Sequence, residues 1–195
     1  MDIIIGIIVM FYVAQTIDLL IRKLLGKGKK STMFLLIPTI LIPAALFGPK
    51  VFWFTFLFLA VYWSNVCRSS GYGLSYHLPL IIIAGVVYGS VGGFIVGFLP
   101  FMIIPYLMPD KKVIDYIVSS ALLGGMGAVS GFFSAGNPLL IQFAISALIV
   151  YNLLRAALLY GKTPIHKITF YIVVNIAVNY FLIQNYLIQW IGTIT

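Results

Sequence analysis

The feature that most constrains this chain is a run, residues 69–109, that carries no charged side chain. Within it, residues 77–108 would extend for about 48 Å as one helix, at 1.5 Å per residue. The hydrocarbon core of a bilayer is only about 30 Å thick, so this stretch is too long for one straight crossing. The whole chain is 62% hydrophobic and 8% charged, whereas soluble domains carry about 25% charged residues. The sequence therefore predicts an integral membrane protein.

Polar and glycine-containing segments divide the chain into eight predicted membrane helices of one all-α bundle. These spans cover residues 3–25, 32–47, 51–66, 72–88, 91–108, 113–135, 139–160 and 168–191. Gly89 and Ser90 provide the natural break in the long apolar stretch. We expect a single integral membrane domain over residues 1–195. The first span lacks a basic n-region and a clear cleavage site, so it is interpreted as a retained helix.

The distribution of basic residues favours eight spans over seven. With a break at Gly89, eleven of the 12 Lys and Arg residues fall on one side, and only Lys50 falls on the other. With one long helix from His77 the ratio becomes six to six. Because basic residues gather on the cytoplasmic side, the first pattern is typical of a multi-pass protein of the cell membrane. Seven spans are the alternative, and the length allows a range of six to eight.

Residues suited to catalysis or metal binding are scarce. The chain has four acidic residues, all aspartates, of which only Asp18 is expected at membrane depth, and Cys67 is its one cysteine. Two-carboxylate catalysis, a metal site and a bound cofactor are therefore not expected. Membrane topology, and not nucleic acid, explains the net charge of +8. An enzyme is the third hypothesis, since Asn152 to Arg155 followed by His166 resembles the Cys/Arg/His intramembrane transpeptidases of the exosortase type.

Small residues recur at helical spacing in two places. Gly85, Gly89, Gly93 and Gly97 are four residues apart, and so are Gly127, Gly131 and Ala135. Residues four apart share a helix face, and glycine allows another backbone to approach closely. Tight packing within the protein is the first interpretation, and docking onto another subunit is the second. If the chain turns at Gly89, only Gly93 and Gly97 share a helix, and Gly85 belongs to its partner.

Polar side chains of the last predicted span gather on one side. At 100° per residue, six of them fall within a sector of roughly 120°: Tyr171, Asn175, Asn179, Asn185, Tyr186 and Gln189. Amides in lipid must find partners, so we expect this sector to face inward. It either forms hydrogen bonds between helices or lines a polar cavity for a solute. Gln15 and Asp18 of the first span are further candidates for such a cavity, although Asp18 and Arg22 also have the spacing of an ion pair.

The stretch from His77 to Gly97, HLPLIIIAGVVYGSVGGFIVG, resembles the substrate-capture (S) components of energy-coupling-factor transporters. In that family, a proline-led apolar helix ends in a glycine turn and a glycine-rich helix follows. The resemblance implies a solute-binding membrane subunit, but it transfers no substrate-binding residue to a position of this chain. The chain departs from the family in its eight predicted spans and in a first span that has only Ala14 in place of a repeated alanine pattern.

Together these patterns predict a small membrane protein that takes part in transport or solute binding through a polar intramembrane cavity. The alternative is a non-catalytic subunit that scaffolds a larger membrane complex. The expected partners are the lipid bilayer, other membrane subunits or a second copy of the chain, and a small-molecule solute.

Overall fold

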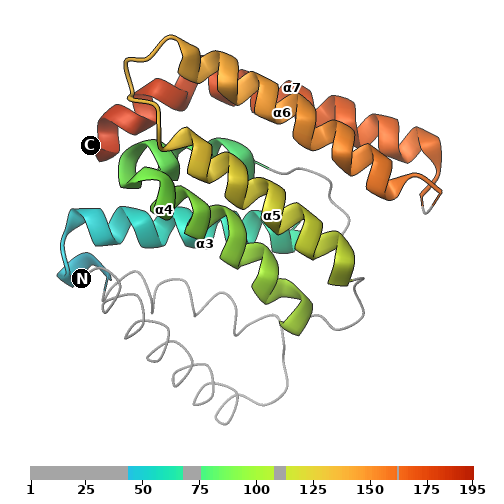
Figure 1. Ribbon diagram of the computed structural model, residues 1–195, viewed down its shortest axis with the longest axis horizontal. Helices are drawn as coiled ribbons and strands as arrows, with labels where there is room; N and C mark the ends of the chain where they lie inside the picture. Colours follow the sequence, from blue (N-terminus) through green and yellow to red (C-terminus); the bar gives the residue numbers. More distant parts are fainter. Residues whose placement is uncertain (1–43, 68–75, 108–112, 162) are drawn as a thin grey trace. The chain divides into compact units, whose positions relative to one another are not determined.

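Every regular element that the structure describes is a helix, which confirms the predicted all-α class. The structure is a computed structural model that describes residues 44–67, 76–107, 113–161 and 163–195. The helices are α3 (Pro49–Cys67), α4 (His77–Leu107), α5 (Val113–Ser130), α6 (Leu139–Leu159) and α7 (Ile165–Ile194), which are labelled in Figure 1. The chain divides into two compact units, residues 1–56 and 57–195, with the boundary inside α3. The helices discussed below belong to the second unit.

By length and composition alone, three stretches of the described helices could cross a membrane: His77–Ile103 within α4, and the whole of α6 and α7. The predicted count of eight is therefore not reached within the described residues, and predicted span 3–25 lies outside them. The predicted span 113–135 is too long, because α5 ends at Ser130. There the Ser130 hydroxyl donates to the carbonyl of Gly127 at 2.7 Å, and residues 131–138 form turns.

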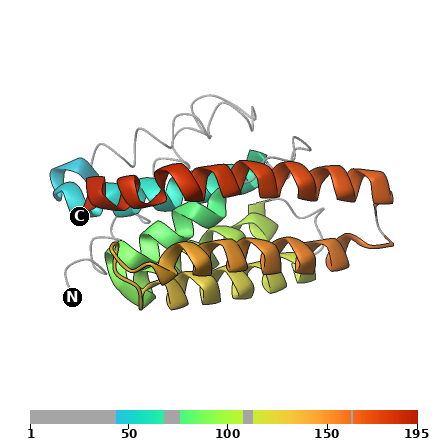
Figure 2. The ribbon, with the colours of Figure 1, turned by 90° about the horizontal axis from the view of Figure 1, so that it is seen from above.

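The long apolar stretch folds back on itself at Gly89, the position of the predicted break. Gly89 has φ 74° and ψ 179°, a backbone conformation that is open to glycine and strained for other residues. It divides α4 into limbs of residues 77–88 and 90–107, about 18 Å and 27 Å long. Figures 1 and 2 show the two green limbs diverging from this point. Both ends of α4 therefore lie on the same side of the fold-back.

Glycines allow α4 and α5 to pack with their backbones in contact. A Cβ built on Gly93 would lie 2.6 Å from the carbonyl carbon of Gly127 and 2.6 Å from the Cα of Gly85. A Cβ on Gly97 would lie 2.7 Å from the carbonyl carbon of Leu123. Contacts this short leave no room for a methyl group, so the two limbs of α4 and the middle of α5 meet through glycine.

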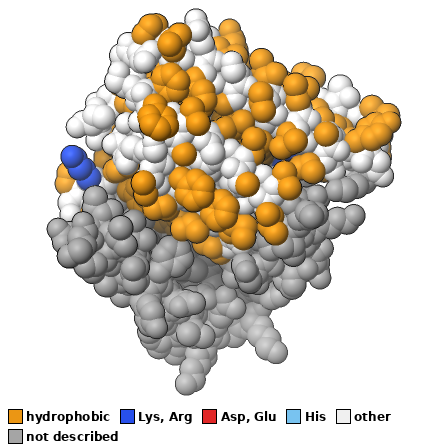
Figure 3. All heavy atoms as spheres, in the orientation of Figure 1, with side chains coloured by type: hydrophobic (Ala, Val, Ile, Leu, Met, Phe, Trp, Pro, Cys, Tyr) orange, Lys and Arg blue, Asp and Glu red, His pale blue; other side chains and the backbone are white. Residues whose placement is uncertain are grey.

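Helices α6 and α7 form an antiparallel hairpin beside α4 (Figures 1 and 2). α6 is about 30 Å long, which matches the hydrocarbon core of a bilayer. Hydrophobic side chains are spread over the face shown in Figure 3. On α6 and α7 the large exposed side chains are mostly apolar, and they include Leu153, Phe170, Val173 and Phe181. This apolar exterior is what a helix hairpin in contact with lipid requires.

Candidate functional site

Three buried asparagines join α6 to α7, and we call them the amide cluster: Asn152, Asn175 and Asn179. Their side chains are 0%, 1% and 1% exposed. The Asn175 amide nitrogen donates to the Asn152 side-chain oxygen at 2.8 Å, and Asn179 donates to the Asn175 side-chain oxygen at 2.9 Å. Asn152 in turn donates to the carbonyl of Leu148 at 2.8 Å. The amide cluster is thus a hydrogen-bonded chain that crosses from one helix to the other.

The positions of these asparagines follow from helical spacing. Asn175 and Asn179 are one turn apart on the buried stripe of α7, which continues through Ile183, Leu187 and Ile191. Asn152 lies on the buried stripe of α6, where the other members are Leu, Ala and Tyr. Because each asparagine occupies a position that is otherwise apolar, folding forces the three amides together in a desolvated interior.

The amide cluster lies at mid-length of both helices. All three residues fall in the middle third of α6 or α7, which run between Leu139 and Leu159 and between Ile165 and Ile194. If the hairpin crosses a bilayer, this level is near the membrane midplane, where water is not available to pair with an amide. A polar group at such a depth is uncommon, and it marks either a helix–helix contact or a functional site.

Aromatic rings and an imidazole pack beside the amide cluster. His77, the first residue of α4, is 1% exposed. Its ring meets Phe101 of the second α4 limb edge-on at 5.1 Å, and it meets Tyr151 of α6 at 5.2 Å. Tyr151 directly precedes Asn152, so the imidazole contacts α6 one residue before the amide cluster in sequence. The first limb of α4 therefore contacts this part of α6 through His77, and the second limb packs on His77 through Phe101.

One cation lies a single helical turn from the amide cluster. Arg155 follows Asn152 by three residues on α6, and its guanidinium carbon lies 5.1 Å from the centre of the Tyr171 ring of α7. This is within the range of a cation–π contact. The Nε atom of Arg155 is buried and has no hydrogen-bond partner among the described residues. The side chain is half-buried, so a permanent positive charge lies between the two helices.

The structure brings together only part of the predicted polar sector. Asn175 and Asn179 are buried and Tyr171 is half-buried, whereas Asn185 and Gln189 are exposed. Asn185 donates to the carbonyl of Phe181 on its own helix at 2.8 Å. The reason is the rotation of the buried stripe: its members are four residues apart, so it turns by about 40° with each step.

By residue 187 this rotation has moved the buried stripe away from the sector that contains Asn185 and Gln189. A sector fixed at one angle therefore describes only the first half of α7. The other two cavity candidates, Gln15 and Asp18, lie outside the described residues.

Sequence reasoning did not include Asn152, His77 or Arg155 among the cavity residues. Asn152 has the clearest signal, because it is an asparagine at mid-length of a predicted span and it stands three residues before an arginine. Its partner Asn175 is 23 positions away, and nothing in the sequence specifies which helices are neighbours.

The residues of the enzyme hypothesis do not form a cluster that the structure describes. Arg155 lies beside Tyr171, and His166 is exposed in the first turn of α7. The side chain of Cys67 is outside the described part of the chain. Among the described residues there is no group of three or more His, Cys, Asp or Glu side chains that could hold a metal ion.

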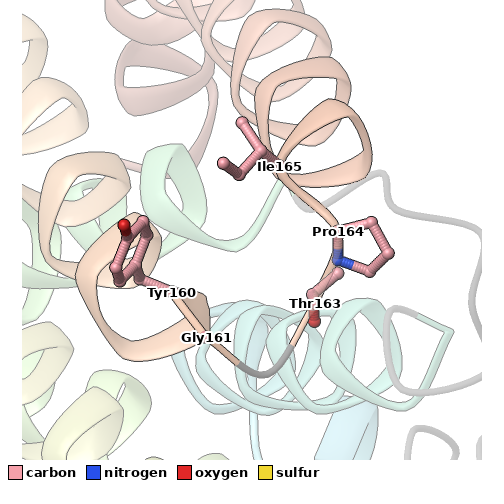
Figure 4. A pocket seen from close by; sticks show the side chains of 5 residues that line it. All are labelled: Tyr160, Gly161, Thr163, Pro164 and Ile165. Atoms are coloured by element: carbon pink, nitrogen blue, oxygen red, sulfur yellow. The ribbon is translucent and has the colours of Figure 1, made fainter.

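An open hollow of about 440 Å³ lies at the connection between α6 and α7. It is lined by Tyr160, Gly161, Thr163, Pro164 and Ile165 (Figure 4). These residues are exposed or half-buried, and none belongs to the amide cluster. The hollow is therefore a surface feature of the connection. Its lining residues do not extend to the amide cluster.

No protein-family model, curated protein or solved structure matches this chain.

Proposed function

We propose that the chain is a multi-pass integral membrane protein of the cell membrane that binds a polar solute at the amide cluster and takes part in its transport. The observation that carries this proposal is a set of three buried, hydrogen-bonded asparagines at mid-length of two helices long enough to cross a membrane. Solute sites of transporters typically lie near the membrane midplane, beside helices that are broken partway. α4, which is broken at Gly89, contacts Tyr151 of α6, the residue before Asn152, through His77 at its first residue.

The proposed topology keeps eight membrane segments, with seven as the alternative. The fold-back at Gly89 supports the split of the long stretch, because it returns the end of α4 toward the side on which α4 begins. The first limb is about 18 Å long, shorter than the hydrocarbon core, so by itself it enters the membrane without crossing it. A non-helical glycine at such depth needs cover from protein, and Gly131 of the α5–α6 connection lies against it.

A scaffolding subunit without a solute is the second candidate. The observation in its favour is that the hydrogen bonds described above join the members of the amide cluster to one another and to the backbone of α6 and α7. Such hydrogen bonds could serve to fix the register of the hairpin. In that role the asparagines would contribute stability, and a single interhelical hydrogen bond in a membrane contributes about 0.6 kcal/mol on average.

Mass spectrometry of co-purifying small molecules separates the two candidates. The protein is extracted with its native lipid, and wild type is compared with Asn175→Leu, Asn179→Leu and Asn185→Leu. Asn185 is the matched control, since it is an exposed asparagine on the same helix. Loss of a polar pairing group should weaken solute binding by about 1–3 kcal/mol, or roughly 5- to 150-fold.

We expect a polar solute that is retained by wild type and by Asn185→Leu, and that is depleted in the two variants of the amide cluster. Melting curves for all four proteins show whether the fold is intact. Equal solute content in all four proteins, or none in wild type, would contradict solute binding and favour the scaffolding subunit.

A further inference from the structure

The strongest unassigned feature of the second unit is the charge of Arg155. Its guanidinium lies against the Tyr171 ring, and its Nε is buried with no hydrogen-bond partner among the described residues. Asp115 is the one acidic residue within the described ranges and its side chain is not described, so no carboxylate partner of this cation is seen among the described side chains. Arginine remains charged at any accessible pH. A half-buried cation between apolar helices is stabilised by a negative charge placed close to it.

We propose that Arg155 is the anion-recognising residue of the site, which therefore takes a ligand with a carboxylate or phosphate group. This inference rests on the proposed function and gives its substrate class. The guanidinium group of Arg155 is planar, and it lies over the Tyr171 ring. The N–H groups at the edges of this planar fork are then left for the ligand. A planar fork of this kind pairs with carboxylate and phosphate oxygens in two parallel hydrogen bonds.

The amide cluster would receive the polar body of the same ligand. Asn152 and Arg155 are three residues apart on one helix, so their side chains begin about 5–6 Å apart on neighbouring positions of one face. A small organic anion spans this distance. Arg155 lies nearer than Asn152 to the α6–α7 connection, which is the end flanked in sequence by Lys162 and Lys167. Anions approaching from that end would meet positive charge before they reach the amides.

Two sources can supply the same negative group: a soluble anion or the headgroup of an anionic lipid. Basic sites between membrane helices bind either. The test therefore uses four probes on the purified full chain. Inorganic phosphate and succinate represent soluble anions, with potassium chloride at equal ionic strength as their reference. Nanodiscs of phosphatidylcholine with and without phosphatidylglycerol represent the lipid source.

The readout is the thermal midpoint as a function of probe concentration, since a ligand that binds only the folded state raises it. We expect phosphate or succinate to stabilise wild type, with an apparent affinity that falls roughly 10- to 150-fold in Arg155→Gln. Arg155→Lys should lie between the two, because it keeps the charge and loses the fork. Lys50→Gln is the matched control, since it removes one exposed charge that does not flank the α6–α7 connection in sequence, and it should behave as wild type.

Stabilisation by phosphatidylglycerol alone, abolished in Arg155→Gln, would support an anion site and assign it to lipid instead of a solute. No stabilisation by any probe, or equal stabilisation of wild type and Arg155→Gln, would overturn the inference. It would also be overturned if Asp18→Asn or Asp115→Asn destabilised the protein as much as Arg155→Gln, with no added loss in the double variant. Arg155 would then be one half of an internal ion pair.

Failure of this inference can be distinguished from failure of the proposed function. A co-purifying solute that is lost from Asn175→Leu and retained by Arg155→Gln would leave solute binding in place and contradict only the anionic class. If Arg155→Gln does not fold, Arg155→Lys is the variant that tests the inference. Unchanged phosphate and succinate affinities in Arg155→Lys would contradict recognition by the guanidinium fork.

Discussion

Substitution of Gly93 by alanine tests the close packing of α4 on α5. The added Cβ would lie 2.6 Å from the carbonyl carbon of Gly127 and 2.6 Å from the Cα of Gly85. Ordinary van der Waals contacts begin near 3.4 Å, so α4 and α5 would have to separate by at least about 0.8 Å, and the carbonyl oxygen of Gly127 lies closer still. Both contacted atoms belong to the backbone, and no side-chain rotation can relieve the overlap. We expect an overpacking cost of about 1–3 kcal/mol in the free energy of unfolding.

Gly125→Ala is the matched control on α5, because a Cβ at Gly125 meets nothing within 4 Å. Both variants gain the helix preference of alanine over glycine, about 0.5–1 kcal/mol, so the difference between them isolates the overlap. The assay is unfolding in mixed micelles, followed by circular dichroism, for wild type and both variants. Gly125→Ala should equal or exceed wild type in stability, with Gly93→Ala lower than Gly125→Ala by about 1–3 kcal/mol. Equal stability of the two variants would refute the close approach at Gly93.

Three further predictions concern the amide cluster, the fold-back and the topology. A double-mutant cycle of Asn152→Ala and Asn175→Ala should give a coupling energy of at least about 0.5 kcal/mol, and additive losses in unfolding experiments would contradict their hydrogen bond. Gly89→Ala should lower the free energy of unfolding by about 1–2 kcal/mol because φ is 74°, and a melting temperature equal to wild type would argue against this backbone conformation. Cysteines placed at Lys29 and Lys112 should both resist labelling from outside the cell, whereas labelling at Lys112 alone would indicate seven spans.

Helix positions and the break in α4 could be predicted from the sequence because they depend on local properties. The lengths of the apolar runs and the polar residues between them locate α6 and α7 to within a few residues at each end. Gly89 could be found because the apolar stretch is longer than a membrane and glycine is the residue that permits a positive φ. The end of α5 is not visible in the sequence, since the turns after Ser130 contain residues as apolar as those of a membrane span.

The candidate site could be predicted only in part because it depends on which helices are neighbours. Asn175 and Asn179 share a helix face, and spacing alone groups them. Asn185 belongs to that group only if one angular sector stays buried along all of α7, but the buried stripe rotates and leaves Asn185 exposed. Asn152 and Arg155 come from another helix, so only the antiparallel register of α6 and α7 reveals them.

The central claim is that polar molecules reach the amide cluster, and thiol accessibility tests it most directly. Cys67, the one cysteine of the chain, is replaced by serine, and single cysteines are then placed at Asn175 and at Ile183. Both positions are buried on the same stripe of α7, so they differ in polar surroundings and not in depth of burial. A small hydrophilic thiol reagent added to the folded protein in membranes should label the cysteine at 175 and spare the one at 183. Absence of labelling at both positions, with both variants folded, would contradict a solute-accessible site.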